Sequence, residues 1–131
     1  MTDKGLETFI QIKLTKKATE TAGFDAATEL LATKVSPTAI TSFNDLLAIG
    51  AQGASHSDIA IAGYENTFLA NLRQISLTSI DSGNFEIALK AAELLTEQPL
   101  DIGKKSKCYL LEPKLVIRNS SKSLATLKAV R

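Results

Sequence analysis

Apolar residues recur along the chain in two periods, one typical of strands and one typical of helices. In Thr8–Leu14, apolar side chains alternate with Gln11 and Lys13, and this period of two predicts a strand. Ile59–Gly63 is a short run of small apolar residues bounded by turns, as expected of a strand buried on both faces. Four further β-prone segments are predicted as strands: Thr38–Ser42, Ser76–Ile80, Cys108–Leu111 and Lys114–Arg118.

Two segments in the first half of the chain have the apolar spacing of helices. Gly23–Thr33 is predicted as a helix with Thr21 as its N-cap. Leu46–Ala51 is predicted as a second helix, and either Asn44 or Asp45 is expected to cap it.

The third predicted helix, Asn84–Gln98, has one apolar face and is ended by Pro99. That face consists of Phe85, Ala88, Leu89, Ala92 and Leu95. Strands therefore alternate with helices, and several strands look buried on both faces. This pattern is typical of an α/β fold with an open, mostly parallel sheet flanked by helices.

Polar pairs follow two of the predicted strands. Asn44-Asp45 comes after Thr38–Ser42, and Glu65-Asn66 comes after Ile59–Gly63. In open α/β sheets ligands bind at the carboxyl ends of the strands, so these pairs are candidate binding residues.

Composition limits the possible chemistry. With 131 residues and 44% hydrophobic residues, the chain has room for one domain with a core. The single cysteine, Cys108, excludes an internal disulfide and a multi-cysteine zinc site, and it is expected to be a buried strand residue. The single histidine, His56, is expected to be an exposed loop residue. We predict no catalytic residues, no metal site and no cofactor, since no nucleophile–base pair or glycine-rich phosphate loop is present.

No apolar stretch approaches the roughly 20 residues of a membrane span, so no membrane partner is expected. The first residues, MTDKGLETFI, do not resemble a secretory signal, and a cytoplasmic protein is predicted.

Charge is unevenly distributed along the chain. Residues 104–131 contain eight basic side chains against Glu112 alone, whereas residues 1–103 are net acidic. We interpret residues 119–131 as a solvated basic tail rich in Ser and Lys. A nucleic-acid site is the less favoured alternative, because this basic segment lacks interleaved aromatic residues and an arginine cluster.

Four motifs in order resemble a known family. They are PTAITSFNDLLAIGA, then DIAIAGYENTFLANLRQISLTSID, then a helix containing AAELL, then LLEPKLVIRNS. This order is similar to the effector-binding core of LacI/GalR transcription regulators, which respond to sugars or nucleosides. The resemblance implies a truncated periplasmic-binding-protein-like I subdomain, with residues 1–118 as a partial effector-binding domain, mostly the C-terminal subdomain.

The resemblance also implies ligand residues. Asn44 matches the family asparagine whose amide bonds effector hydroxyls, with helix capping as the alternative role. Glu65 stands where the family has an aspartate that accepts from two hydroxyls, with a solvated loop acid as the alternative. Ser82 lies where many members have a glutamine, and Asp81 lies beside it. Asp45 is expected to cap the helix rather than contact ligand.

Some parts of the family pattern are missing from the sequence. The helix-turn-helix expected for DNA contact is not found, so DNA binding is expected only through a missing N-terminal domain. The helix after Asn44 looks shortened. Without its usual packing partner the segment 82–98 would expose its apolar stripe, so the chain is expected to form a homo-oligomer or to rearrange so that Phe85, Leu89 and Leu95 are covered. The predicted function is effector sensing. The alternative is a short protein-interaction module that dimerises with full-length regulators without binding ligand.

Overall fold

The computed structural model describes residues 9–56, 58–97 and 108–122. A four-stranded sheet in the order β1-β2-β3-β4 forms its centre, with β1 at Ala39–Thr41, β2 at Ala60–Tyr64, β3 at Thr78–Asp81 and β4 at Lys114–Val116. The first three strands are parallel and β4 is antiparallel to β3, which confirms the prediction of a mostly parallel sheet.

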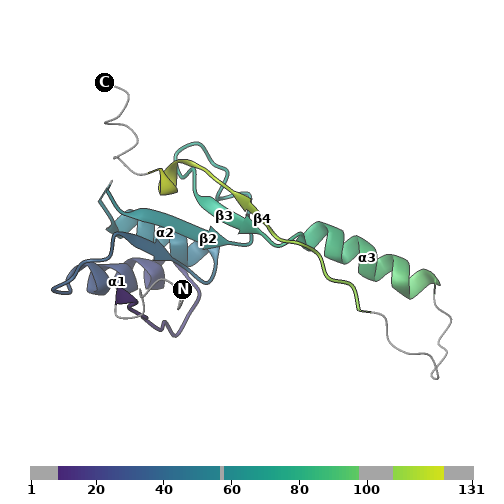
Figure 1. The fold of residues 1–131 in the computed structure, drawn as a ribbon, viewed down its shortest axis with the longest axis horizontal. Coiled ribbons are helices and arrows are strands. Elements are labelled where there is room, and N and C mark those ends of the chain that lie inside the picture. The colour runs from purple at the N-terminus through teal and green to yellow at the C-terminus, as the bar shows by residue number, and fades with distance from the viewer. Residues whose placement is uncertain (1–8, 57, 98–107, 123–131) are drawn as a thin grey trace.

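Two helices cover one face of this sheet. Helix α2, Asp45–Ala54, packs on β2, and helix α1, Glu20–Leu31, packs on α2 (Figure 1). The two helices approach closely because each has a glycine at the crossing: a Cβ on Gly50 would overlap the Glu20 carbonyl oxygen, and a Cβ on Gly23 would overlap that of Leu47. The buried core is correspondingly rich in small residues: Ala27, Ala48, Ala51, Ile61, Ala70 and Leu77.

Helix α3, Asn84–Glu97, projects away from this body beside the extended segment that precedes β4 (Figure 1). Its predicted apolar face is exposed, with Phe85 at 72%, Leu89 at 51% and Leu95 at 82% of full exposure. Within the described ranges the chain does not rearrange to cover these side chains, so of the two expected outcomes a homo-oligomer stays a prediction.

The segment after β4 returns to the sheet. Asn119–Ser121 forms the short 3-10 helix η3, and Ser120 Oγ accepts a hydrogen bond from Thr78 N at 2.8 Å and donates one to the Ile61 carbonyl at 2.7 Å. The first residues of the segment expected to be a basic tail are thus hydrogen-bonded to β3 and β2. The rest of that segment, 123–131, lies outside the described residues, as does the predicted helix end at Gln98 and Pro99. No described helix is long and apolar enough to cross a membrane.

Two predicted strands are wrong. Residues 9–14 are not paired, because Gln11 Nε2 donates to the Val35 carbonyl at 2.7 Å and Lys13 pairs with Glu29 of α1. These bonds hold the segment against α1 and the loop that follows, away from the sheet. Cys108–Leu111 is extended but also unpaired, since it lies beside α3, where Lys90 Nζ is 5.0 Å from the Tyr109 ring centroid.

Two residue-level predictions are also corrected. The N-cap of α1 is Thr19 rather than Thr21, because the helix begins three residues earlier than the apolar spacing indicated and Thr19 Oγ1 accepts from Ala22 N. Cys108 is exposed rather than buried, because the strand in which it was placed does not form. His56 is exposed, as predicted.

Candidate functional site

Parallel strands bring the candidate residues to one edge of the sheet. Asn44 follows β1, Glu65 follows β2, Asp81 ends β3 and Ser82 follows it. Because these three strands run in the same direction, their carboxyl ends meet at the same edge, where ligands of open α/β sheets bind.

Asn44 is buried at the start of α2. It has extended backbone angles, and its Oδ1 accepts a hydrogen bond from Leu47 N at 3.0 Å, so it is the N-cap of the helix. Of the two candidates for this cap, the structure selects Asn44 rather than Asp45. Capping uses only the oxygen of the amide, and Asn44 Nδ2 makes no hydrogen bond with any residue in the described ranges.

Asp45 has a role that sequence reasoning missed. Its carboxylate is fully buried, with Oδ1 accepting from Ser79 Oγ at 2.6 Å and Oδ2 accepting from both the backbone N and the Oγ1 of Thr67, at 2.6 and 2.9 Å. This side chain ties the first turn of α2 to β3 and to the loop after β2. The partners lie 22 and 34 residues away in sequence, so no local pattern reveals them.

The turn after β2 has an unusual backbone. Glu65 has φ 100° and Asn66 has φ 49°, both in the left-handed region that L-residues rarely occupy. Strain of this kind is of order 1–3 kcal/mol per residue and is found preferentially at functional sites. The Glu65 backbone N donates to the Ile80 carbonyl at 2.9 Å, while its exposed carboxylate makes no hydrogen bond or ion pair with any described residue.

A chain of hydrogen bonds holds this turn against β3 and the end of β4. Arg118 Nη2 donates to Asn66 Oδ1 at 2.7 Å, and Arg118 Nη1 donates to the Leu77 carbonyl at 2.6 Å. Asn66 Nδ2 in turn donates to Asp81 Oδ2 at 3.0 Å. Arg118, which was not singled out from the sequence, and Asn66, a member of the polar pair after β2, therefore position the candidate Asp81.

The turn after β3 stabilises the charged form of Asp81. Gly83 N donates to Asp81 Oδ1 at 2.9 Å, and Gly83 has φ 72°. This backbone bond, the bond from Asn66 and the nearby charge of Lys114 lower the pKa of Asp81 below its ordinary value of 3.8, although partial desolvation opposes them. Ser82 Oγ donates to Asn84 Oδ1 at 3.0 Å, at the start of α3.

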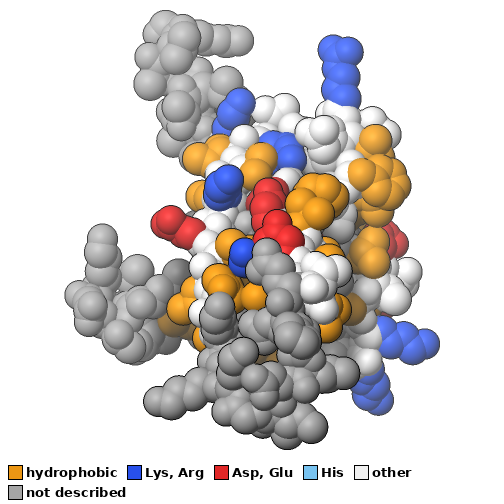
Figure 2. All heavy atoms as spheres, turned by 90° about the vertical axis from the view of Figure 1, so that its right-hand side faces the viewer, with side chains coloured by type: hydrophobic (Ala, Val, Ile, Leu, Met, Phe, Trp, Pro, Cys, Tyr) orange, Lys and Arg blue, Asp and Glu red, His pale blue; other side chains and the backbone are white. Residues whose placement is uncertain are grey.

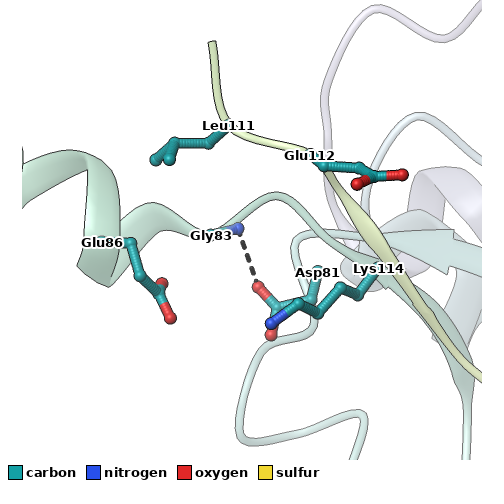
Figure 3. Close-up of a pocket in the computed structure, with 6 residues that line it drawn as sticks. All are labelled: Asp81, Gly83, Glu86, Leu111, Glu112 and Lys114. Atoms are coloured by element: carbon teal, nitrogen blue, oxygen red, sulfur yellow. Dashed lines mark hydrogen bonds between the residues drawn. The ribbon is translucent and has the colours of Figure 1, made fainter. Parts of the chain in front are cut away.

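A hollow of about 250 Å³ lies next to Asp81, at the junction of the sheet with α3. Figure 3 shows Lys114 extending alongside the Asp81 carboxylate, with Glu86 of α3 and Glu112 of the segment before β4 nearby. Three carboxylates and one ammonium favour a neutral ligand rich in hydroxyls over an anion, because hydroxyls donate to carboxylates whereas an anion is repelled.

Figure 2 shows the side of the molecule from which α3 projects. Acidic side chains gather near the middle of this side, with hydrophobic side chains around them. Within the described ranges, no three His, Cys, Asp or Glu side chains are arranged to hold a metal ion.

Comparison with known proteins places this fold in one class. The family profile described as "Periplasmic binding protein-like domain" matches residues 3–121. The chain belongs to this family, and its relatives place it with the effector-binding cores of LacI-type transcription regulators, which confirms the resemblance seen in the motifs.

One curated relative is the HTH-type transcriptional repressor PurR of Photobacterium profundum, which is 33% identical over 107 residues, or 76% of this chain and 32% of that protein. A LacI-family transcriptional regulatory protein from Corynebacterium glutamicum superposes with a TM-score of 0.68 at 35% identity, covering 83% of this chain and 46% of that one. A LacI-family regulator from Enterococcus faecium with bound ribose superposes with a TM-score of 0.67 at 25% identity, covering 79% and 40%.

This chain spans about a third of the length of the curated relatives it matches. Those relatives are transcriptional repressors, which is consistent with the prediction that the chain is not an enzyme.

Proposed function

We propose that this chain senses a small hydroxyl-rich effector, a sugar or a nucleoside, as part of a LacI-type regulator. The effector binds at the carboxyl ends of β1, β2 and β3. The observation that carries the proposal is that Asn44, Glu65, Asp81 and Ser82 all stand at the carboxyl ends of parallel strands, in a periplasmic-binding-protein-like domain. The regulator with bound ribose supports a polyol as the kind of ligand.

Each residue has a distinct part in the proposed site. Glu65 accepts from two hydroxyls, since its carboxylate is exposed and the strained turn holds it at the strand end. Asn44 donates through Nδ2, because Oδ1 is already engaged by the helix. Asp81 accepts through lone pairs not used by Gly83 and Asn66, and Ser82 provides a hydroxyl on the α3 side.

Glu65→Gln tests the proposal, because Glu65 is exposed and its removal leaves the folded core intact. The unfolding temperature is measured with ribose and, separately, with a purine nucleoside. We expect one of them to raise the Tm of the wild-type chain and to have a clearly smaller effect on Glu65→Gln. Asp58→Asn, at an exposed acid in the turn before β2, is the matched control and is expected to respond like wild type.

A Tm unchanged by both classes of ligand contradicts effector sensing. Co-precipitation of a full-length LacI-type regulator under those conditions then favours the alternative, an interaction module that dimerises with regulators without binding ligand.

A further inference from the structure

A groove of about 930 Å³ runs along the outer edge of β1. Every residue from Pro37 to Phe43 lines it, and since side chains of a strand alternate between two faces, only the edge of β1 can present all of them. The opposite wall is the segment Phe9–Ala18, and the floor includes Leu30 of α1 and Leu47 of α2.

Along the β1 edge that faces this groove, some backbone groups are left unpaired by the residues that the structure describes. Ala60 N donates to the Thr38 carbonyl at 3.1 Å and Ser42 N donates to the Ala62 carbonyl at 2.9 Å, so alternate residues of β1 bond to β2. The N–H and C=O groups of the residues between them, Ala39 and Thr41, therefore point away from β2. An edge of this kind is a template for a further strand.

The opposite wall is held away from β1. Gln11 bonds to Val35 and Lys13 pairs with Glu29, and Phe9 and Ile12 on this wall remain 70% and 81% exposed. The groove is therefore an apolar slot between two extended stretches of chain.

The charges that line the groove indicate which kind of segment it can bind and in which orientation. None of the described residues lining it is acidic, whereas Lys13, Lys16 and Lys17 all line it. Lys13 already pairs with Glu29. Lys16 and Lys17 lie shortly before α1, whose first turn packs on the first half of α2. Since α2 begins just after β1 ends, these lysines lie towards the carboxyl end of β1. A strand parallel to β1 with an acid at its carboxyl end complements this arrangement.

This chain contains a segment with these properties. Cys108–Glu112 is extended, exposed and outside the sheet, with Leu110 at 92% exposure. Glu112, at the carboxyl end of the apolar run, is its one acidic side chain, and Lys107 and Lys114 flank the segment. Five residues of strand span about 17 Å.

We propose that the groove binds Cys108–Glu112 of a second copy of this chain as a strand parallel to β1. The contact joins two different surfaces, so it links copies head to tail, into a ring or an open chain.

Disulfide trapping tests the contact, because Cys108 is the only cysteine. One protein carries Ala39→Cys together with Cys108→Ser and is mixed with the wild-type chain under mild oxidation. If the bound segment runs parallel to β1, its amino end lies beside residue 39. The thiol introduced at residue 39 of the first protein then lies next to Cys108 of the second protein, and a disulfide-linked mixed dimer is expected.

The control is Arg73→Cys combined with Cys108→Ser, which places the thiol in an exposed turn outside the groove. A mixed dimer no more abundant than with Arg73→Cys overturns the proposal.

Charge reversal provides a second test, measured as the dissociation constant for self-association by sedimentation. Leu110→Lys and Glu112→Lys are each expected to weaken association, Leu110→Lys by about tenfold or more. Lys16→Glu with Lys17→Glu is expected to recover association when combined with Glu112→Lys. Association lost in Leu95→Lys of α3 but kept in Leu110→Lys assigns the contact to α3 and overturns the proposal, as does a monomer at every concentration.

Discussion

At the scale of single residues, the buried carboxylate of Asp45 organises the edge where the candidate ligand residues lie. A buried charge is costly unless hydrogen bonds compensate for its lost hydration. Asp45 accepts three such bonds, from Thr67 and Ser79. Gly63 of β2 leaves room for the carboxylate, since a Cβ there would overlap Asp45 Oδ1. The strained Glu65–Asn66 turn lies directly before Thr67, so Asp45 restrains the turn through it.

Asp45→Asn is expected to lower the free energy of unfolding by about 2 kcal/mol. Both carboxylate oxygens of Asp45 accept hydrogen bonds, whereas an asparagine has one acceptor oxygen, so its NH2 group would face a donor. Urea unfolding followed by circular dichroism measures this difference. Asp58→Asn, at an exposed turn residue, is the control and should stay within about 0.5 kcal/mol of wild type. Equal stability of Asp45→Asn and wild type would contradict the role assigned to these bonds.

Asp81 makes stability depend on pH in the acid range. Its pKa is lowered in the folded state by Gly83, Asn66 and Lys114, so its contribution to stability is complete above the ordinary pKa of 3.8. The contribution is lost as the pH falls through the lower folded value. Asp81→Asn is therefore expected to flatten the decline of stability below about pH 4, measured as urea midpoints between about pH 5 and pH 3.

Lys114→Gln removes only the nearby charge, so its stability profile should lie between those of wild type and Asp81→Asn. Parallel profiles for all three proteins would show that Asp81 does not control this decline.

At the scale of elements, the packing of α1 on α2 depends on two glycines. Gly50 and Gly23 leave room for the backbone of the opposite helix, which a side chain would fill. Gly53 is on the same helix as Gly50, but a Cβ there would lie 3.6 Å from Phe24 Cδ2, an ordinary contact distance.

Gly50 and Gly53 of α2 form a matched pair for mutation. Gly50→Ala is expected to destabilise the fold by about 1–3 kcal/mol, because the overlap with the Glu20 carbonyl forces α1 away. Gly53→Ala is expected to stabilise it by about 0.5–1 kcal/mol, because alanine loses less backbone entropy in a helix. Thermal unfolding measures both, and shifts of the same sign would contradict the close helix crossing.

At the scale of the whole molecule, the chain consists of a packed body and a projecting arm. The body contains the sheet with α1 and α2, and the arm contains α3 with the segment before β4 (Figure 1). Helices of about 12–15 residues are marginal in water without tertiary packing. Because its apolar face is exposed, α3 gains little stability from packing on the body.

Hydrogen exchange at low protein concentration should show this difference. Amides of α3 are expected to exchange at least about tenfold faster than those of α2, whose Leu47, Ala48 and Ala51 are buried. Equal protection of the two helices at every concentration would contradict an unpacked α3. Protection of α3 that grows with concentration would show that a second copy covers it.

Local patterns were sufficient for most elements. The strands at Ala39–Thr41 and Ala60–Tyr64 and the helix at Asn84–Glu97 follow the predicted segments within a few residues. Helical and strand periodicity depends on near neighbours in sequence, and so does helix capping, which is why Asn44 could be selected as one of two cap candidates. The placement of the candidate ligand residues at one edge follows from the parallel strand order.

The sequence by itself therefore determined the α/β class and the family, and it predicted the edge of the sheet at which we propose that a ligand binds. Only the tertiary structure decided that residues 9–14 and Cys108–Leu111 stay unpaired, that Asp45 bonds to Thr67 and Ser79, and that Arg118 positions Asn66. Strand pairing and the satisfaction of buried charges depend on partners tens of residues away. A period of two shows that a segment suits a sheet, but a strand forms only where another strand offers its edge.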